Sequence, residues 1–151
     1  MGPDGLRRLN SESRSFKMSI QEQYIQIPES RSEGEMKIIR YSEAEAKKYP
    51  SDQAKGAAGR VVIGQADGAK NFCMRVFEIS KGGITGKHAH EWEHEVFVHS
   101  GEGAILRDGK WVSLSTGSVV FIPGNEEHQL KNTGNEPFTF VCVIPSGVPE
   151  L

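Results

Sequence analysis

The sequence predicts an all-β domain, a sandwich or barrel, and two features carry this prediction. From Arg60 onward, short runs of β-branched and aromatic residues alternate with Gly, Asp, Asn and Pro, a texture typical of strands joined by tight turns. Asp108-Gly109 stands between two such runs, and this pair favours a two-residue hairpin turn, which needs positive φ at both positions. A chain of 151 residues is long enough for one such core and too short for two ordinary domains.

The first part of the chain carries little strand signal. Residues 1–35 are rich in Ser, Glu, Arg and Gln without a sustained apolar period, which predicts a flexible N-terminal arm. The first 17 contain no apolar core of a secretory signal. They are interpreted as a disordered tail or an upstream extension before a start at Met18, with a transit peptide as the alternative. Residues 36–151 then form the domain. Ser42 followed by Glu45 is a capping box that predicts a short helix ending at Pro50, and Gly56 to Gly59 is interpreted as a flexible link.

About eight strands are expected in the body of the domain. They are residues 61–63, 71–79, 95–99, 104–106, 110–114, 118–122, 128–131 and 137–144. The sequence shows neither an internal repeat nor a heptad pattern.

Charge and hydropathy exclude several classes of protein. The net charge of −2 and the pI near 6.2 argue against binding to nucleic acid or to an anionic membrane surface. Mean hydropathy is −0.47, and no apolar run approaches the roughly 18 residues of a membrane helix, so a soluble protein is expected. Two widely separated cysteines, Cys73 and Cys142, do not describe a disulfide framework and favour a reducing, cytoplasmic setting.

Histidines are the strongest chemical signal. Three of the five lie within seven residues, His88, His90 and His94, and His128 follows a later strand and a proline turn. On an extended chain, positions two apart point to the same face, so His88 and His90 have chelating geometry. Imidazole is the commonest metal-binding side chain, yet the spacing alone also fits surface histidines flanked by glutamates.

At these residues the sequence resembles the cupin family over about residues 58–147. The first cupin motif, which runs from a glycine through His-x-His to a metal-binding Glu and a final glycine, matches Gly82, His88, His90, position 94 and Gly101. The second motif, which runs from a glycine through Pro-x-Gly to His and Asn, matches Gly117, Pro123, Asn125, His128 and Asn132. The resemblance implies a jelly-roll barrel, that is, a double-stranded β-helix, with a pocket at its mouth.

Two positions depart from the family pattern. Asn125 replaces a turn glycine, a mild change because Asn tolerates the left-handed conformation. His94 stands where the motif has Glu; a register shift would offer Glu95 instead, but Glu95 points to the opposite face of the strand. The stretch from His88 to Val98 is also similar to a subgroup of small single-domain cupins with a four-histidine manganese centre. This resemblance implies that His88, His90, His94 and His128 are the metal ligands.

Four imidazoles leave a divalent ion more positively charged than three imidazoles and a carboxylate. Such a site favours an anionic small-molecule substrate, and a six-coordinate ion would keep two positions open for it. We expect Mn²⁺ or Fe²⁺ as the cofactor, although Ni²⁺, Zn²⁺ or Cu²⁺ would bind more tightly in a purified sample.

The strand over residues 137–144 is expected to line the pocket. Alternation places Phe140, Cys142 and Ile144 on one face, which serves either as a pocket wall or as ordinary packing. Arg75 is the one charge in an apolar strand; facing inward it would hold an anionic group, and facing outward it would be a surface residue. No general base is evident, since all three tyrosines precede the predicted strands.

The leading functional hypothesis is an oxidoreductase of dioxygenase type that acts on an enolate, a diketone or an alkene-like substrate. The alternatives are a metal-dependent isomerase, lyase or decarboxylase, and a non-catalytic module that binds a small ligand. Neither nucleic acid nor a membrane is an expected partner. By analogy with small cupins, and because open sheet edges are usually covered, we expect a homodimer.

Overall fold

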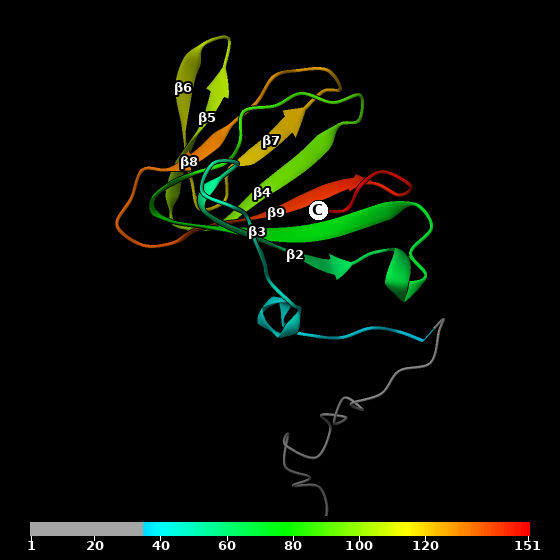
Figure 1. Ribbon diagram of the computed structural model, residues 1–151. Helices are drawn as coiled ribbons and strands as arrows, with labels where there is room; N and C mark the ends of the chain where they lie inside the picture. Colours follow the sequence, from blue (N-terminus) through cyan, green and yellow to red (C-terminus); the bar gives the residue numbers. More distant parts are fainter. Residues whose placement is uncertain (1–34) are drawn as a thin grey trace, which may run out of the picture. The chain divides into compact units, whose positions relative to one another are not determined.

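The computed structural model describes residues 35–151, and these residues are almost entirely β-structure (Figure 1). The strands are β1 (Lys47–Lys48), β2 (Lys55–Ile63), β3 (Phe72–Ile84), β4 (His94–Ser100), β5 (Glu102–Arg107), β6 (Lys110–Ser115), β7 (Val119–Ile122), β8 (Leu130–Asn132) and β9 (Phe138–Pro145). Two 3₁₀ turns, η2 (Tyr41–Glu43) and η3 (Gln65–Asp67), are the helical elements of this part of the chain. The predicted all-β fold is confirmed. Neither of these turns is long enough to cross a membrane.

The strands form one antiparallel sheet that curls on itself. Its order is β6-β5-β8-β3-β9-β4-β7, and β2 and β1 extend it beside β3. Although β6 and β4 are separated by four strands in this order, they lie in contact, so the sheet bends around its inner face. Figure 1 shows this bend, with β5 and β6 rising away from β3. The inner face holds the core, whose fully buried side chains include Ile79, Val98, Phe138 and Ile144.

Each of the eight predicted strands overlaps an observed one. The hairpin prediction also holds, because Asp108 and Gly109 have φ values of 48° and 71° between the paired residues Arg107 and Lys110. Strand β3 runs five residues beyond its predicted end at Ile79, to Ile84. It does so because Ile84 pairs with both Lys55 and Lys131, a tertiary contact that local propensity does not contain.

The predicted link over Gly56 to Gly59 is wrong, because these residues belong to strand β2. Gly59 shows why a glycine occurs within this strand. A Cβ there would lie 2.8 Å from the ring of Phe77 and 2.7 Å from Leu151. The glycine therefore permits close packing, and the sequence signal was misread as flexibility.

The predicted helix from Ser42 to Pro50 is present only as the 3₁₀ turn η2. Its capping interaction lies upstream of the predicted one, with the Glu43 carboxylate accepting from the Arg40 N–H at 3.0 Å. Ala44 is already extended, and the chain continues into β1, which pairs with β2. Strand pairing thus replaces most of the helix. The predicted arm, residues 1–35, lies outside the described residues except for its last position.

Candidate metal centre

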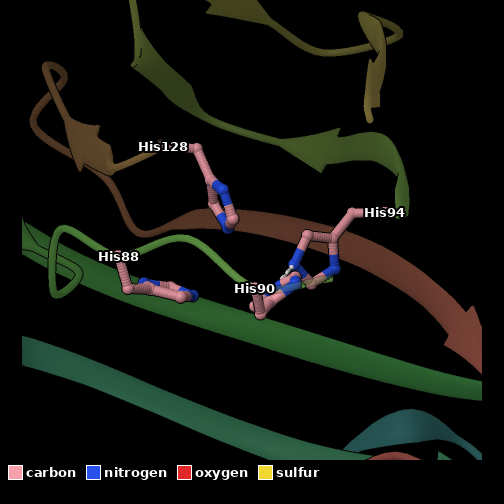
Figure 2. Close-up of side chains that lie close together, drawn as sticks. All are labelled: His88, His90, His94 and His128. Carbon is pink, nitrogen blue, oxygen red and sulfur yellow. Dashed lines mark hydrogen bonds between the residues drawn. The ribbon is translucent and has the colours of Figure 1, made fainter. Parts of the chain in front are cut away.

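Four histidine side chains converge on the inner side of the sheet, as Figure 2 shows. One nitrogen from each of His88, His90, His94 and His128 lies within 4.8 Å of those of the other three. His94 is the first residue of β4, and His128 precedes β8. The other two lie on the segment that follows β3. The group therefore joins residues that are forty positions apart in the sequence at its extremes.

Backbone contacts hold the two histidine segments together. His88 and His128 exchange both of their backbone hydrogen bonds, with N···O distances of 3.2 and 2.9 Å. The N–H of Asn125 donates to the carbonyl of His90 at 2.6 Å. Next to it, Gly124 lies so close to the backbone of Glu91 that a Cβ could not be accommodated. The turn before His128 is thereby docked on the segment that carries His90.

Three of the rings are oriented by backbone carbonyls. In each case Nδ1 lies 2.8 to 3.0 Å from a carbonyl oxygen two residues away in the chain. The pairs are His88 with Gly86, His90 with Trp92 and His128 with Glu126. A carbonyl can only accept, so Nδ1 donates its N–H and Nε2 carries the lone pair that can bind an ion. Such outer contacts typically fix the tautomer of a ligating histidine.

His94 is oriented differently. Its Nδ1 lies 3.0 Å from a guanidinium nitrogen of Arg75 and 3.2 Å from the sulfur of Cys142. Since a guanidinium can only donate, Nδ1 accepts, and the Nε2–H of His94 donates to Nε2 of His90 at 2.7 Å. A metal ion at Nε2 of His94 would require the other neutral tautomer, in which the proton is on Nδ1 and faces the Cys142 sulfur.

Burial keeps these rings neutral. The pKa of His94 falls to about 3, chiefly because burial penalises the charged form, and the neighbouring Arg75 lowers it further. The pKa of His128 falls to about 4 for the same main reason, although its bond to the Glu126 carbonyl opposes the shift. Burial also lowers the pKa of His90. At neutral pH these three rings are therefore uncharged, the state in which imidazole binds a metal.

These shifts make the stability of the metal-free protein depend on pH. Between the ordinary histidine pKa of 6.5 and the folded values of about 3 and 4, the unfolded chain binds more protons than the folded one. Stability should therefore fall as pH drops through this window, by on the order of 2 kcal/mol for each of the two buried histidines at about pH 5. Urea unfolding of metal-free protein at about pH 7.5 and pH 5 checks this. His128→Gln should flatten the dependence, and equal slopes for the variant and the original protein would contradict the assignment.

The donor set fits a divalent transition metal. Four imidazoles and no carboxylate make up the group, a combination suited to a divalent transition metal and unlike the oxygen-rich sites of Ca²⁺ and Mg²⁺. Glu95, the alternative fourth ligand, is exposed and lies outside the group. The alternation of strand β4 places its side chain on the other face of the sheet from His94.

A cavity of about 470 Å³ adjoins the histidines. Of the predicted wall residues, Arg75, Phe140 and Cys142 line this cavity. Ile144, predicted to share the wall, instead is fully buried in the core, where it pairs with Cys73 of β3. Phe140, Cys142 and Ile144 do lie on one buried face of β9, but the cavity does not extend as far as Ile144.

Arg75 faces inward, one of the two orientations that the sequence left open. It is 7% exposed, and it donates to the Glu150 carbonyl at 3.3 Å and to the Cys142 sulfur at 2.9 Å. Burial raises the pKa of the Cys142 thiol, and Arg75 opposes this shift. Cys142 is thus a protonated wall residue in contact with the guanidinium.

Several cavity residues escaped the sequence-based prediction. The cavity is also lined by Tyr49, Phe77 and Leu151. Tyr49 and Leu151 lie outside the predicted strands. Tyr49 directly follows β1, and its N–H donates to the carbonyl of Ala57 at 3.3 Å, which continues the pairing of β1 with β2. Phe77 lies two positions after Arg75 in β3 and therefore shares its face of the strand. This spacing was the one signal that could have identified Phe77 as a wall residue.

The remaining histidine and the acidic residues stand apart from the centre. His99 packs edge-on against Tyr41, away from the four-histidine group. The acceptors for the Nδ1–H groups of His88, His90 and His128 are backbone carbonyls. Trp92 stacks on the ring of His90, with 4.0 Å between the ring centres, and lines the cavity.

A curled antiparallel sheet with histidines on its inner face is the architecture of a cupin, and the comparisons with known proteins agree. The family model described as Cupin domain matches residues 75–144. The solved structure of the polyketide cyclase RemF from Streptomyces resistomycificus is 31% identical, with a TM-score of 0.69, over 74% of this chain and 80% of that one. The chain belongs to the cupin family.

Curated relatives from two classes also match. An oxalate-binding protein of Thermotoga maritima is 37% identical over 68 residues, which are 44% of this chain and 56% of that protein. A glucose-6-phosphate isomerase of Pyrococcus furiosus is 33% identical over 94 residues, 54% of this chain and 50% of that protein. The chain thus spans only about half the length of these relatives.

Proposed function

We propose that the protein is a metal-dependent enzyme in which His88, His90, His94 and His128 hold a divalent ion, Mn²⁺ or Fe²⁺ in the cell. The observation that carries this proposal is the convergence of four histidine nitrogens within 4.8 Å beside a cavity large enough for a substrate. When bound, the metal would supply Lewis acidity to an oxygen-containing substrate. An enolisable dicarbonyl compound fits, because it offers two oxygen atoms and becomes an anion when it loses a proton.

The residues of the chain would favour the anionic form of such a substrate. Arg75 is the positively charged side chain of the cavity wall, and a buried charge acts strongly across a low-dielectric cavity. Burial raises the pKa of Tyr49, so its hydroxyl stays protonated and can donate a hydrogen bond to a substrate oxygen. The stacked rings of Phe77 and Phe140 would exclude water from that side.

The first candidate reaction is of dioxygenase type, in which the bound enolate, diketone or alkene-like substrate reacts with dioxygen. Oxygen uptake by protein loaded with Mn²⁺ or Fe²⁺ should be measured with diketones, enols and styrene-like alkenes, and product formation should be followed in parallel. Metal-dependent uptake that is lost in His128→Ala supports this reaction. Product formation under nitrogen without uptake would contradict it.

The second candidate is a reaction that needs no oxidant, such as isomerisation, carbon–carbon bond formation or cleavage, or decarboxylation. Tyr49 favours it, because a protonated hydroxyl in the cavity wall can assist proton transfer to an enolate. The similarity to a polyketide cyclase and to a glucose-6-phosphate isomerase supports the same kind of reaction. If compounds bind but none is converted, either in the presence of dioxygen or under nitrogen, a non-catalytic binding role is favoured instead.

We also propose a cytoplasmic homodimer. Both cysteines are free and buried, which suits a reducing compartment. Phe97, Val119 and Phe121, on the neighbouring strands β4 and β7, are exposed apolar side chains of the kind that partner surfaces cover. A monomeric mass in solution scattering would refute the dimer.

A further inference from the structure

The wall of the cavity beyond the histidines is aromatic. Phe77 on β3 and Phe140 on β9 are direct partners in the sheet, and their rings stack at 5.4 Å with an angle of 20°. Phe140 is 3% exposed, whereas Phe77 is only partly buried and so offers surface to a ligand. Two neighbouring rings on one face are suited to packing against a flat apolar group.

The charges of the wall are few and of one sign. Apart from the histidines, Arg75 is the one charged side chain lining the cavity in the part of the chain that the structure describes, and no Lys, Asp or Glu lines it. Its guanidinium contacts a carbonyl, a thiol and an imidazole and lies 5.1 Å from the centre of the Phe77 ring. None of the ion pairs between residues 35 and 151 includes it. Its buried charge is therefore not neutralised by an acidic residue, and a ligand with one negative charge would compensate it.

The size of the cavity argues against the smallest ligands. About 470 Å³ falls in the range of cavities that enclose drug-sized molecules. A two-carbon dicarboxylate would leave most of this apolar space empty, and a sugar phosphate would find neither a cluster of cations nor the carboxylates that bind hydroxyl groups. The wall instead matches a flat apolar body that carries a single anionic group.

We infer that the cavity selects an aromatic β-dicarbonyl compound, bound as its monoanionic enolate, with the oxygen atoms toward the histidines and the aromatic ring against Phe77. This inference rests on the proposed function, because the oxygen atoms need the metal ion as a partner. It adds the aromatic body to the substrate class and assigns the recognition of that body to Phe77. Arg75 then serves as the charge that favours the enolate over the neutral ketone.

Two probes that share the dicarbonyl group test the inference. Benzoylacetone carries a phenyl ring where acetylacetone carries a methyl group, so the ratio of their affinities reports on the aromatic wall alone. Protein loaded with Co²⁺ is titrated with each compound, and the visible spectrum of the metal reports binding at the ion. Burial of the phenyl ring should make benzoylacetone bind at least about tenfold more tightly. This comparison of the two affinities needs only the unaltered protein.

Two variants assign the preference to residues. Phe77→Leu should reduce the ratio of the two affinities to below about threefold. Phe72→Leu, which changes an exposed ring of the same strand that does not line the cavity, should leave this ratio unchanged. Arg75→Met should weaken both compounds at least about tenfold, with Arg75→Lys retaining part of the affinity. Equal affinity of the two compounds would overturn the inference and leave the proposed function standing. A cobalt spectrum that neither compound alters would overturn both.

Discussion

Replacement of His128 by alanine should abolish metal binding at physiological concentrations. The side chain supplies one of the four nitrogens of the group, and its ring is held by the Glu126 carbonyl at 2.8 Å. Changes to such outer contacts alone commonly cost 10- to 100-fold in metal affinity, so loss of a direct ligand should cost at least about 100-fold. Competition with a chelator of known affinity measures the change for Co²⁺ and Zn²⁺.

Two further variants separate loss of a ligand from loss of structure. His88→Ala removes an exposed ring of the same group with little effect on packing, and it should weaken metal binding to a similar degree. His99→Ala is the matched control, since this histidine contacts Tyr41 instead. Unchanged metal affinity in His88→Ala, or an equal loss in His99→Ala, would show that the group does not bind the ion as proposed.

Alanine at Gly124 should destabilise the protein and weaken its metal site together. The added Cβ would meet the backbone of Glu91, which cannot move aside as a side chain can. Relief of this overlap must separate the turn before His128 from the segment of His90, where the N–H of Asn125 now donates to the His90 carbonyl. Overpacking of this kind costs about 1–3 kcal/mol. Urea unfolding and metal competition on the same variant measure the two effects.

A neighbouring substitution is the control for this prediction. Asn125 has a φ of 65°, a conformation that glycine adopts without strain, so Asn125→Gly should retain both stability and metal affinity. It also restores the glycine that the cupin motif has at this position. If Gly124→Ala matched Asn125→Gly in both measurements, the close contact with Glu91 would not be what aligns the two motifs.

Most of the fold follows from local patterns in the sequence. Strands such as β5 and β6 could be predicted because alternation and the Asp108-Gly109 turn act within a few residues. The errors occurred where distant contacts decide the structure. A glycine is required at position 59 because Phe77 and Leu151 pack against it. The predicted helix after Ser42 is largely replaced by the pairing of β1 with β2.

The site could be predicted in part, for a similar reason. The resemblance to the cupin motifs indicated the four histidines that the structure brings together, whereas their spacing alone also fitted surface histidines. The spacing of the motifs contains no information on Tyr49, which lines the cavity but directly follows β1, outside both motifs. Nor could it decide the side to which Arg75 points, since a single charge in an apolar strand is compatible with either face until the packing against His94 is known.

An anomalous-scattering map from crystals of protein purified without added metal tests the central claim most directly. The account predicts one strong peak within bonding distance of Nε2 of His88, His90, His94 and His128, with an absorption edge that identifies a transition metal, and with part of the coordination sphere facing the cavity. Four rings that enclose no ion even after soaking with Mn²⁺ or Fe²⁺, or an ion surrounded by protein atoms on all sides, would contradict it.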